Sequence, residues 1–153
     1  MAPAEHRLEM ARIAFAGQDR VVVDDRELRR QGPSFTTDTL AELAEQHPEH
    51  RLFFLIGSDN LPLLPTWHEH HRLLRLATVV TWPRRGHPID PAALEQLDLE
   101  PQERAALLAH ALRLPSDDVS ATALRAQLQA DSPPPTALPP AVADYIRRHG
   151  LYR

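Results

Sequence analysis

An unbroken apolar run, Leu52–Ile56, passes directly into the polar segment Gly57–Asn60 near the middle of the chain. Five consecutive apolar residues without alternation predict a strand that is buried on both faces, as in a parallel sheet covered by helices. Gly57 lets the backbone turn sharply or approach a ligand closely. Asp59 and Asn60 follow the carboxyl end of the strand, where open α/β sheets bind their ligands. The run therefore predicts an α/β protein whose ligand site includes residues 57–60.

Composition narrows the class of protein. At 153 residues the chain suits a single domain, residues 1–153, and its formal net charge of −4 argues against broad electrostatic binding to nucleic acid or to an anionic membrane. The absence of Cys excludes disulfides and thiolate chemistry. No apolar run approaches the ~20 residues of a membrane span, and the first residues lack the apolar core of a signal peptide. We expect a soluble, cytoplasmic protein without nucleic-acid or membrane partners.

Strand and helix signals alternate along the chain. Strands are predicted at Val21–Val23, Leu52–Ile56 and Ala77–Trp82, with a further short strand at residues 111–114. Residues 24–32 predict a solvated loop. The helices are predicted at residues 4–16, from Thr36 or Thr37 as N-cap to Gln46, from Pro65 to Arg75, at 90–98, at 101–112, from Ser120 as N-cap, and at 141–148. This alternation is typical of a parallel, Rossmann-like sheet with flanking helices.

Several side chains after the predicted strands suit ligand binding, and each also has a purely structural explanation. Trp67 is available to stack on a ring or to anchor the core. Arg84, after the strand that ends at Trp82, can hold a phosphate or be an exposed loop residue. Ser120 and Thr122, with Arg125 one turn on, form either an ordinary capped helix start or a phosphate cradle.

Three histidines close to Trp67 raise the question of a metal. On a helix, His68 and His71 share one face while His70 points away, and no HExxH pattern is present. The sequence also has no Walker loop, GxGxxG segment or nucleophile elbow. We therefore assign no metal ligand and no catalytic residue, and a metal site built from these histidines ranks last among the possible functions.

Segments spread over essentially the whole chain carry a family pattern. They are Asp25–Leu28, Gly32–Leu40, Ile56–Asn60, Pro65–Trp67, Val119–Arg125, and the C-terminal stretches 138–142, 145–146 and 150–153. In this order they resemble bacterial nicotinate-nucleotide adenylyltransferase, a member of the nucleotidyltransferase superfamily. The resemblance implies transfer of AMP from ATP to nicotinate mononucleotide, giving deamido-NAD and pyrophosphate in NAD biosynthesis, with Mg²⁺ as cofactor.

The resemblance also implies roles for individual residues. The segment 35–37 is expected to line the nicotinate pocket, Trp67 to stack on the pyridine ring, and the backbone near His68 to receive the nicotinate carboxylate. Arg84 is expected near a phosphate, while the remaining residues contact the nucleotide or hold the ATP phosphates. The residues assigned to nicotinate mononucleotide are Phe35, Thr36, Thr37, Trp67, His68 and Arg84, and those assigned to ATP are Gly57, Asp59, Ser120, Thr122 and Arg125.

The sequence departs from the family pattern in several places. Phe35 stands where Tyr is frequent, Ala121 replaces a Ser, and Arg85 replaces the Pro of an Arg-Pro-Gly turn. The family's opening strand with its GTFDPxHxGH loop, and the strand that follows, do not occur in these residues. That segment is about one βαβ unit, on the order of 30 to 50 residues.

The missing pattern leads to three expectations. First, we expect the sequence to be a fragment, the product of a misassigned start codon, or a degenerate relative of the family. Because the family's first strand lies beside the Leu52–Ile56 strand, one long edge of that strand is expected to be open. Without the HxGH loop, the 153-residue polypeptide is expected to be inactive by itself.

Three functions therefore stay open. The first is nicotinate-nucleotide adenylyltransferase. The alternative is a non-catalytic, truncated nucleotide-binding or interaction protein that keeps the nicotinate pocket. The third is a related adenylyltransferase that accepts nicotinamide mononucleotide. The sequence predicts no oligomeric state.

Overall fold

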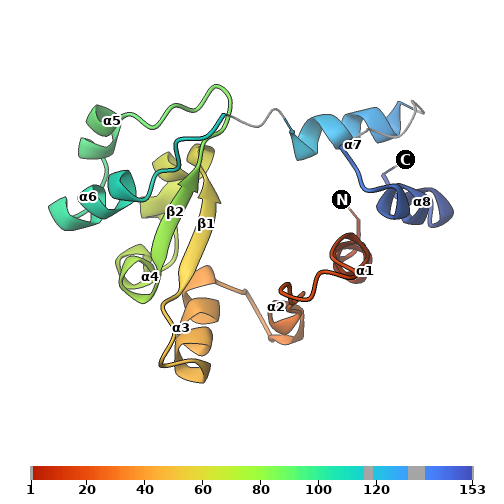
Figure 1. The fold of residues 1–153 in the computed structure, drawn as a ribbon, viewed down its shortest axis with the longest axis horizontal. Helices are drawn as coiled ribbons and strands as arrows, with labels where there is room; N and C mark the ends of the chain where they lie inside the picture. The colour runs from red at the N-terminus through yellow and green to blue at the C-terminus, as the bar shows by residue number, and fades with distance from the viewer. Residues whose placement is uncertain (1, 116–118, 131–136, 153) are drawn as a thin grey trace. The chain divides into compact units, whose positions relative to one another are not determined.

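The computed structural model describes residues 2–115, 119–130 and 137–152, which fall into two compact units (Figure 1). Residues 31–118 form one unit, called here the sheet unit because it holds both strands. Residues 1–30 and 119–153 form the other, called the terminal unit because it holds both ends of the chain.

Two parallel strands form the centre of the sheet unit. β1 (Phe53–Gly57) pairs with β2 (Thr78–Trp82), with Phe53 opposite Thr78 and Gly57 opposite Trp82. On the far side of β2, Ala111 forms a single parallel bridge to Thr81. The predicted parallel sheet is confirmed, and the strand predicted at residues 111–114 is reduced to this one bridge.

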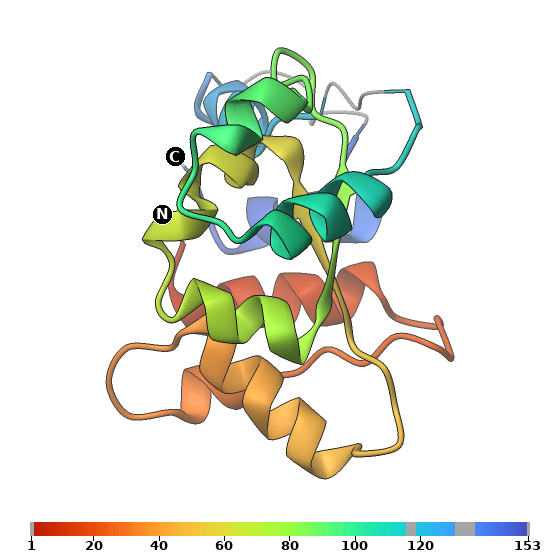
Figure 2. The ribbon, with the colours of Figure 1, turned by 90° about the vertical axis from the view of Figure 1, so that its left-hand side faces the viewer.

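One face of the sheet carries the hydrophobic core. Ile56 and Val79 point to this face and are buried, and Leu64 and Leu73 in the same cluster are fully buried. Figure 2 shows two helices, α4 (His70–Leu76) and α6 (Pro101–Ala109), in front of the strands on this face. The helices of the sheet unit are α3 (Thr36–Gln46), the 3₁₀ helix η1 (Ser58–Thr66), α4 (His70–Leu76), α5 (Pro91–Glu95) and α6 (Pro101–Ala109).

The side chains of β1 alternate between buried and exposed, contrary to the prediction of burial on both faces. Phe53 and Leu55 are 59% and 58% exposed, whereas Ile56 is buried. Successive side chains of a strand point to opposite faces, so these two lie on the face opposite the core. In the described residues β1 pairs with β2 alone, which confirms the expected open edge.

The terminal unit consists of short helices. These are α1 (Ala4–Ala14), α2 (Arg26–Arg29), α7 (Ala121–Gln129) and α8 (Pro140–Arg148). α1 packs against α8, and the Nδ1 atom of His6 lies 2.8 Å from the hydroxyl oxygen of Tyr145. In the part of the chain that the structure describes, no helix is long and apolar enough to cross a membrane.

Two predictions for the terminal unit are wrong. Residues 21–25 are coil rather than a strand, and Val22 is 88% exposed. A β-branched run becomes a strand only where a partner pairs with its backbone groups, and propensity cannot supply that partner. The predicted loop at residues 24–32 contains α2, and the main-chain N–H of its first residue, Arg26, donates to Asp24 Oδ1 at 2.9 Å.

Two helix starts in the sheet unit also differ from the prediction. The N-cap of α3 is Phe35, so Thr36 and Thr37 lie inside the helix. Trp67 does not open a helix, because η1 ends at Thr66 and α4 begins only at His70. Trp67 is extended, with φ −77° and ψ 145°, and Glu69 adopts a left-handed conformation with φ 49° that separates the two helices.

Candidate functional site

A cavity of about 260 Å³ lies between the start of α3 and the turn that precedes α4. Ser34, Thr66 and Leu73 form part of its lining. The other lining residues are five of the six assigned to nicotinate mononucleotide, namely Phe35, Thr36, Thr37, Trp67 and His68. The structure thus brings two segments, 35–37 and 67–68, together around one cavity.

Two contacts hold the turn at His68 against α3. The hydroxyl of Thr37, a residue only 1% exposed, donates a hydrogen bond to the main-chain oxygen of His68 at 2.6 Å. The ring of Phe35 stacks on the imidazole of His68, with ring centroids 4.1 Å apart and an interplanar angle of 27°. The Thr37 bond could not be predicted, since nothing in a sequence relates a helical Thr to a carbonyl 31 residues away.

Trp67 anchors the core and also lines the cavity, and its stacking on a ligand ring stays a prediction. Its half-buried indole meets the ring of Phe54 edge-on, with centroids 6.1 Å apart, and packs against the core. The same side chain lines the cavity, together with the fully buried Leu73. A ring fixed at one edge and accessible elsewhere is well suited to stacking on a flat ligand.

A second group of assigned residues surrounds the carboxyl end of β1. A Cβ atom built on Gly57 would lie 2.2 Å from Asp59 Oδ1 and 3.0 Å from Arg84 Nε. Gly57 has φ −76°, which any residue can adopt, and a Cβ here would first meet the side chains of Asp59 and Arg84, so the absence of a side chain lets these two groups close over the strand end. Arg84 therefore lies with the residues assigned to ATP, outside the lining of the 260 Å³ cavity.

The ion pair between Arg84 and Asp59 contributes little to stability, because both side chains are exposed to water. Arg84 Nε and Asp59 Oδ1 are 3.8 Å apart, and the two side chains are 42% and 43% exposed. Exposed pairs of this kind contribute about 0–1 kcal/mol, so little free energy opposes their separation by an incoming ligand.

Ser58 connects the loops that follow the two strands. Its hydroxyl donates to the main-chain oxygen of His87 at 2.7 Å and accepts from the main-chain N–H of Arg84 at 2.8 Å. Ser58 is buried at 3% exposure, so both bonds are shielded from water. This role of Ser58 was not predicted from the sequence. The available signal was a small polar residue directly after a buried strand.

The remaining assigned residues lie in the terminal unit, at the start of α7. Ser120 is confirmed as the N-cap, because its hydroxyl accepts from Ala123 N–H at 3.3 Å. Arg125 Nη2 donates to Thr122 Oγ1 at 3.4 Å. Ser120 and Thr122 are exposed, and their role toward ATP stays a prediction.

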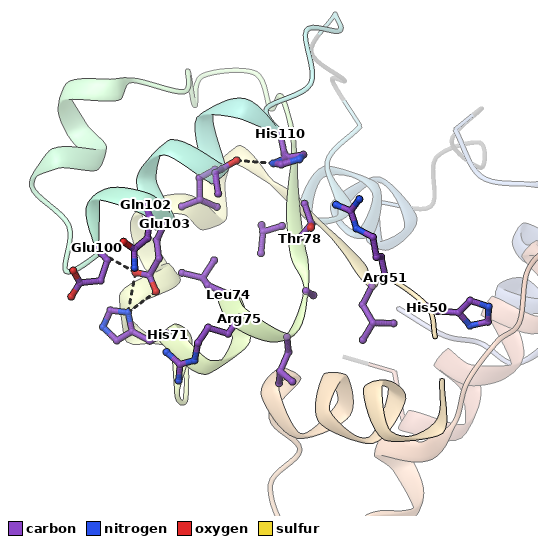
Figure 3. Close-up of a pocket in the computed structure, with 16 residues that line it drawn as sticks. His50, Arg51, His71, Leu74, Arg75, Thr78, Glu100, Gln102, Glu103 and His110 are labelled. Carbon is purple, nitrogen blue, oxygen red and sulfur yellow. Dashed lines mark hydrogen bonds and ion pairs between the residues drawn. The ribbon is translucent and has the colours of Figure 1, made fainter. Parts of the chain in front are cut away.

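A larger cavity, of about 800 Å³, lies at the amino ends of the two strands (Figure 3). Its lining includes Leu52 and Thr78, at the amino ends of the two strands, together with His71, Glu103 and His110. No residue assigned from the sequence lines it. Because open α/β sheets bind their ligands at the carboxyl ends of strands, we take the smaller cavity and the Gly57 group as the candidate site.

Comparison with known proteins gives the family. The sequence model of a family described as cytidylyltransferase-like matches residues 1–127. A protein of Chromobacterium violaceum named probable nicotinate-nucleotide adenylyltransferase is 42% identical over 163 residues, with 99% of this chain and 76% of the relative covered. A relative of the same name from Aeromonas hydrophila subsp. hydrophila is 42% identical over 160 residues, with 98% and 74% covered. The chain thus spans about three quarters of the length of these relatives.

Solved structures share the fold. The nicotinic acid mononucleotide adenylyltransferase of Plasmodium falciparum, complexed with NaAD, superimposes with a TM-score of 0.74 at 20% sequence identity, covering 99% of this chain and 75% of the other. The same enzyme complexed with APC gives a TM-score of 0.73, covering 99% and 77%. The fold class is therefore α/β with a Rossmann-like parallel sheet. On the family match and the 42% identity, this chain belongs to the cytidylyltransferase-like family and, within it, to the nicotinate-nucleotide adenylyltransferases.

Proposed function

We propose that the protein acts in the transfer of AMP from ATP to nicotinate mononucleotide, which yields deamido-NAD and pyrophosphate. The observation that carries the proposal is the cavity in which Phe35, Thr37, Trp67 and His68 meet. Its lining joins residues that the family resemblance assigned to one ligand, although they come from separate segments of the chain. The proposal includes a cytoplasmic location and a set of partners limited to these small molecules.

The lining of the cavity suits a flat ring that carries a carboxylate. Trp67 and Phe35 offer aromatic faces, and stacked aromatic pairs are worth about 0.5–1.5 kcal/mol beyond the area they bury. A carboxylate only accepts hydrogen bonds, so it requires donors and is repelled by free acceptors. The hydroxyl of Thr36, in the lining, is able to donate a hydrogen bond to such a carboxylate. The His68 carbonyl, an acceptor, already receives a hydrogen bond from Thr37 and so is not a free acceptor facing the carboxylate.

The nucleotide would be held by the remaining assigned residues. We propose that Gly57 and Asp59 receive the ribose and backbone of the nucleotide and that Arg84 lies near a phosphate. The start of α7, with Ser120, Thr122 and Arg125, would hold ATP phosphates, since a helix N-terminus favours anions.

Mg²⁺ is part of the proposal. When bound, the ion neutralises charge on the phosphates during transfer. Among the described residues, the two groups of possible metal ligands do not include Asp59, so the Gly57 group offers no carboxylate cage. This donor set suits an ion that arrives on ATP and keeps most of its ligands from phosphate and water.

The reaction is an in-line displacement. An oxygen of the nicotinate mononucleotide phosphate attacks the α-phosphorus of ATP, a P–O bond forms, and the bond to pyrophosphate breaks. Catalysis of such a transfer rests on positioning and on neutralising charge. These 153 residues contain no GTFDPxHxGH segment. For that reason a second candidate, binding of the nucleotide without turnover by this polypeptide, is retained.

Calorimetry with nicotinate mononucleotide tests the proposal. We expect saturable binding that weakens at least about 30-fold in Trp67→Ala, the loss typical of a buried aromatic anchor. Trp67→Phe should keep most of the affinity, because it retains a ring. Absence of binding to the wild-type chain would overturn the proposal.

Turnover and acceptor choice separate the three functions. Binding without deamido-NAD formation from ATP by residues 1–153 supports the second candidate for this polypeptide. Tighter binding of nicotinamide mononucleotide than of the nicotinate form would support the third function and contradict the first.

A further inference from the structure

Three side chains with metal-binding atoms meet where the start of α4 faces the segment between α5 and α6. One ring nitrogen each of His70 and His71 and one carboxylate oxygen of Asp98 lie within 4.8 Å of one another. The two imidazole centroids are 3.9 Å apart. His70 is 9% exposed, whereas Asp98 lies at the surface, so the group is anchored on one side and open to an ion on the other.

The partners of the two rings determine which nitrogen of each carries the proton. His70 Nε2 lies 3.0 Å from the main-chain oxygen of Asp98, which can only accept. Nε2 is therefore the donor, and in the neutral ring Nδ1 of His70 carries the lone pair. His71 Nδ1 lies 3.0 Å from both carboxylate oxygens of Glu103, which can only accept, so in the neutral ring Nε2 of His71 carries the lone pair (Figure 3). A neutral ring whose N–H is bound to a carbonyl or carboxylate is the usual state of a metal-bound histidine.

Glu103 is itself held in place by a helix end. Its Oε2 accepts from the main-chain N–H of Glu100 at 2.8 Å, as part of the capping box of α6. The Glu103 side chain is only 11% exposed. The carboxylate that orients His71 is thus fixed by the local structure of α6, whether or not an ion is bound.

This group differs from the histidine set considered in the sequence analysis. The expectation that His68 and His71 share a helical face is wrong, because α4 begins only at His70. His68 instead stacks on Phe35 at the nicotinate cavity. Asp98, which completes the group, lies 28 residues after His70, so no short motif revealed it.

The donor set selects the class of metal. Two imidazole nitrogens and one carboxylate oxygen suit Zn²⁺ and similar transition metals, whereas Mg²⁺ and Ca²⁺ prefer oxygen alone. Zinc bonds of about 2.0–2.1 Å in a tetrahedral site require donors about 3.3 Å apart. The three donors already lie within 4.8 Å of one another, so small side-chain rotations bring them to this spacing, and water would fill the fourth position.

We propose that His70, His71 and Asp98 bind one Zn²⁺ ion, with Glu103 as the positioning residue behind His71. The ion joins the start of α4 to the segment before α6. Because Trp67, His68 and Glu69 immediately precede His70, it also stiffens the turn that forms one wall of the nicotinate cavity. The inference stands on the geometry of the sheet unit and does not depend on the proposed function.

A second histidine group provides a matched control. His47, Glu49 and His50 also offer three donor atoms within 4.8 Å, but all three residues are exposed. We expect this group to contribute no retained zinc, because mobile exposed side chains must be ordered before they can bind.

The test uses the 153-residue chain without a polyhistidine tag. Zn²⁺ is added, the protein is passed through a desalting column, and zinc is measured by elemental analysis and calorimetry. We expect one retained equivalent, and visible absorption typical of tetrahedral coordination when Co²⁺ replaces it. His47→Ala/His50→Ala should keep the equivalent. Asp98→Ala should weaken binding at least about 10-fold without disturbing the fold, because His70 contacts the main chain of Asp98 and not its carboxylate.

Glu103→Gln tests the positioning role separately. Gln preserves a capping box but replaces the carboxylate, so we expect zinc affinity to fall about 10–100-fold while the helix content is unchanged. His71→Ala should abolish the retained equivalent. No retained zinc in the wild-type chain would overturn the inference, as would unchanged affinity in both Asp98→Ala and His71→Ala.

Discussion

The hydroxyl of Thr37 donates a 2.6 Å hydrogen bond to the main-chain oxygen of His68, joining the first turn of α3 to the turn that carries Trp67. Thr37 is almost completely buried, so water cannot replace this bond. One side chain thus couples stability of the sheet unit to the shape of the cavity proposed to bind nicotinate, since both residues line it.

Thr37→Val keeps the shape of the side chain and removes the donor. We expect a loss of about 1–3 kcal/mol in the free energy of unfolding, because the His68 carbonyl is left without its partner. Chemical denaturation measures this loss. The affinity for nicotinate mononucleotide should fall about 10-fold, which corresponds to a loss of roughly 1.4 kcal/mol in binding free energy. Thr37→Ser restores the hydroxyl and should behave like wild type. Equal affinity in Thr37→Val and wild type would contradict the coupling.

Ser58→Ala removes two buried hydrogen bonds at once. The carbonyl of His87 and the N–H of Arg84 lose their partner, and we expect a cost of about 1–3 kcal/mol in unfolding free energy. ATP-analogue affinity, measured by calorimetry, should fall as well, because the bond positions the backbone of Arg84. The matched control is Thr66→Ala, whose hydroxyl makes only an exposed local bond to the Leu63 carbonyl. A cost for Ser58→Ala no larger than for this control would show that Ser58 does not hold the two loops.

Leu73→Ala creates a hole at the fully buried base of the cavity. We expect a loss of about 2–5 kcal/mol in unfolding free energy, from lost burial and from the void left behind. Leu63→Ala is the matched control, because Leu63 is 53% exposed, and it should change stability by less than about 0.5 kcal/mol. Thermal and urea unfolding followed by circular dichroism compare the two variants. Similar melting curves would mean that Leu73 is not packed in solution as it is here.

The turn before α2 depends on pH through Asp24. The main-chain N–H of Arg26 first, and then its side chain, hold the pKa of the Asp24 carboxyl below its usual 3.8. A lowered pKa means that the ionised carboxylate stabilises the folded turn above pH 3.8 and that this stabilisation is lost as pH falls through the folded value. The side chain is 38% exposed, so the effect is small and local.

Amide hydrogen exchange at Arg26 measures this effect. At pH 7, Asp24→Asn should reduce protection of the Arg26 amide, whereas the exposed Asp19→Asn should not. Below the folded pKa of Asp24 the wild type and Asp24→Asn should show the same protection. A difference that persisted in strong acid would exclude the carboxylate as its cause.

Elements with strong local signals could be predicted from the sequence. Both strands and the helices α1, α3, α5, α6, α7 and α8 lie within a few residues of their predicted positions. Proline in the first turn of α5 and α6, and Ser120 before α7, are local signals that act through the helix's own first N–H groups. Because such signals act between neighbouring residues, the helices that depend on them can be predicted from the sequence alone.

Predictions that required a distant partner failed or were incomplete. Val21–Val23 has high strand propensity but lies in coil, and the helical spacing assumed for His68 does not exist. The family resemblance predicted that residues 35–37, Trp67 and His68 line one pocket, and the structure brings them together around one cavity. The hydrogen bond from Thr37 to the His68 carbonyl, which joins the two segments, could not be predicted.

The sequence by itself determined the α/β class, the positions of most elements, and the residue types available at the ends of the strands, because propensity, capping and apolar periodicity act between near neighbours. Only the tertiary structure decided that Phe53 and Leu55 face away from the core, that Ser58 joins two loops, and that His70 and His71 meet Asp98. These relationships depend on how segments separated by about 30 residues pack together, and packing is set by the whole core rather than by any one stretch of chain.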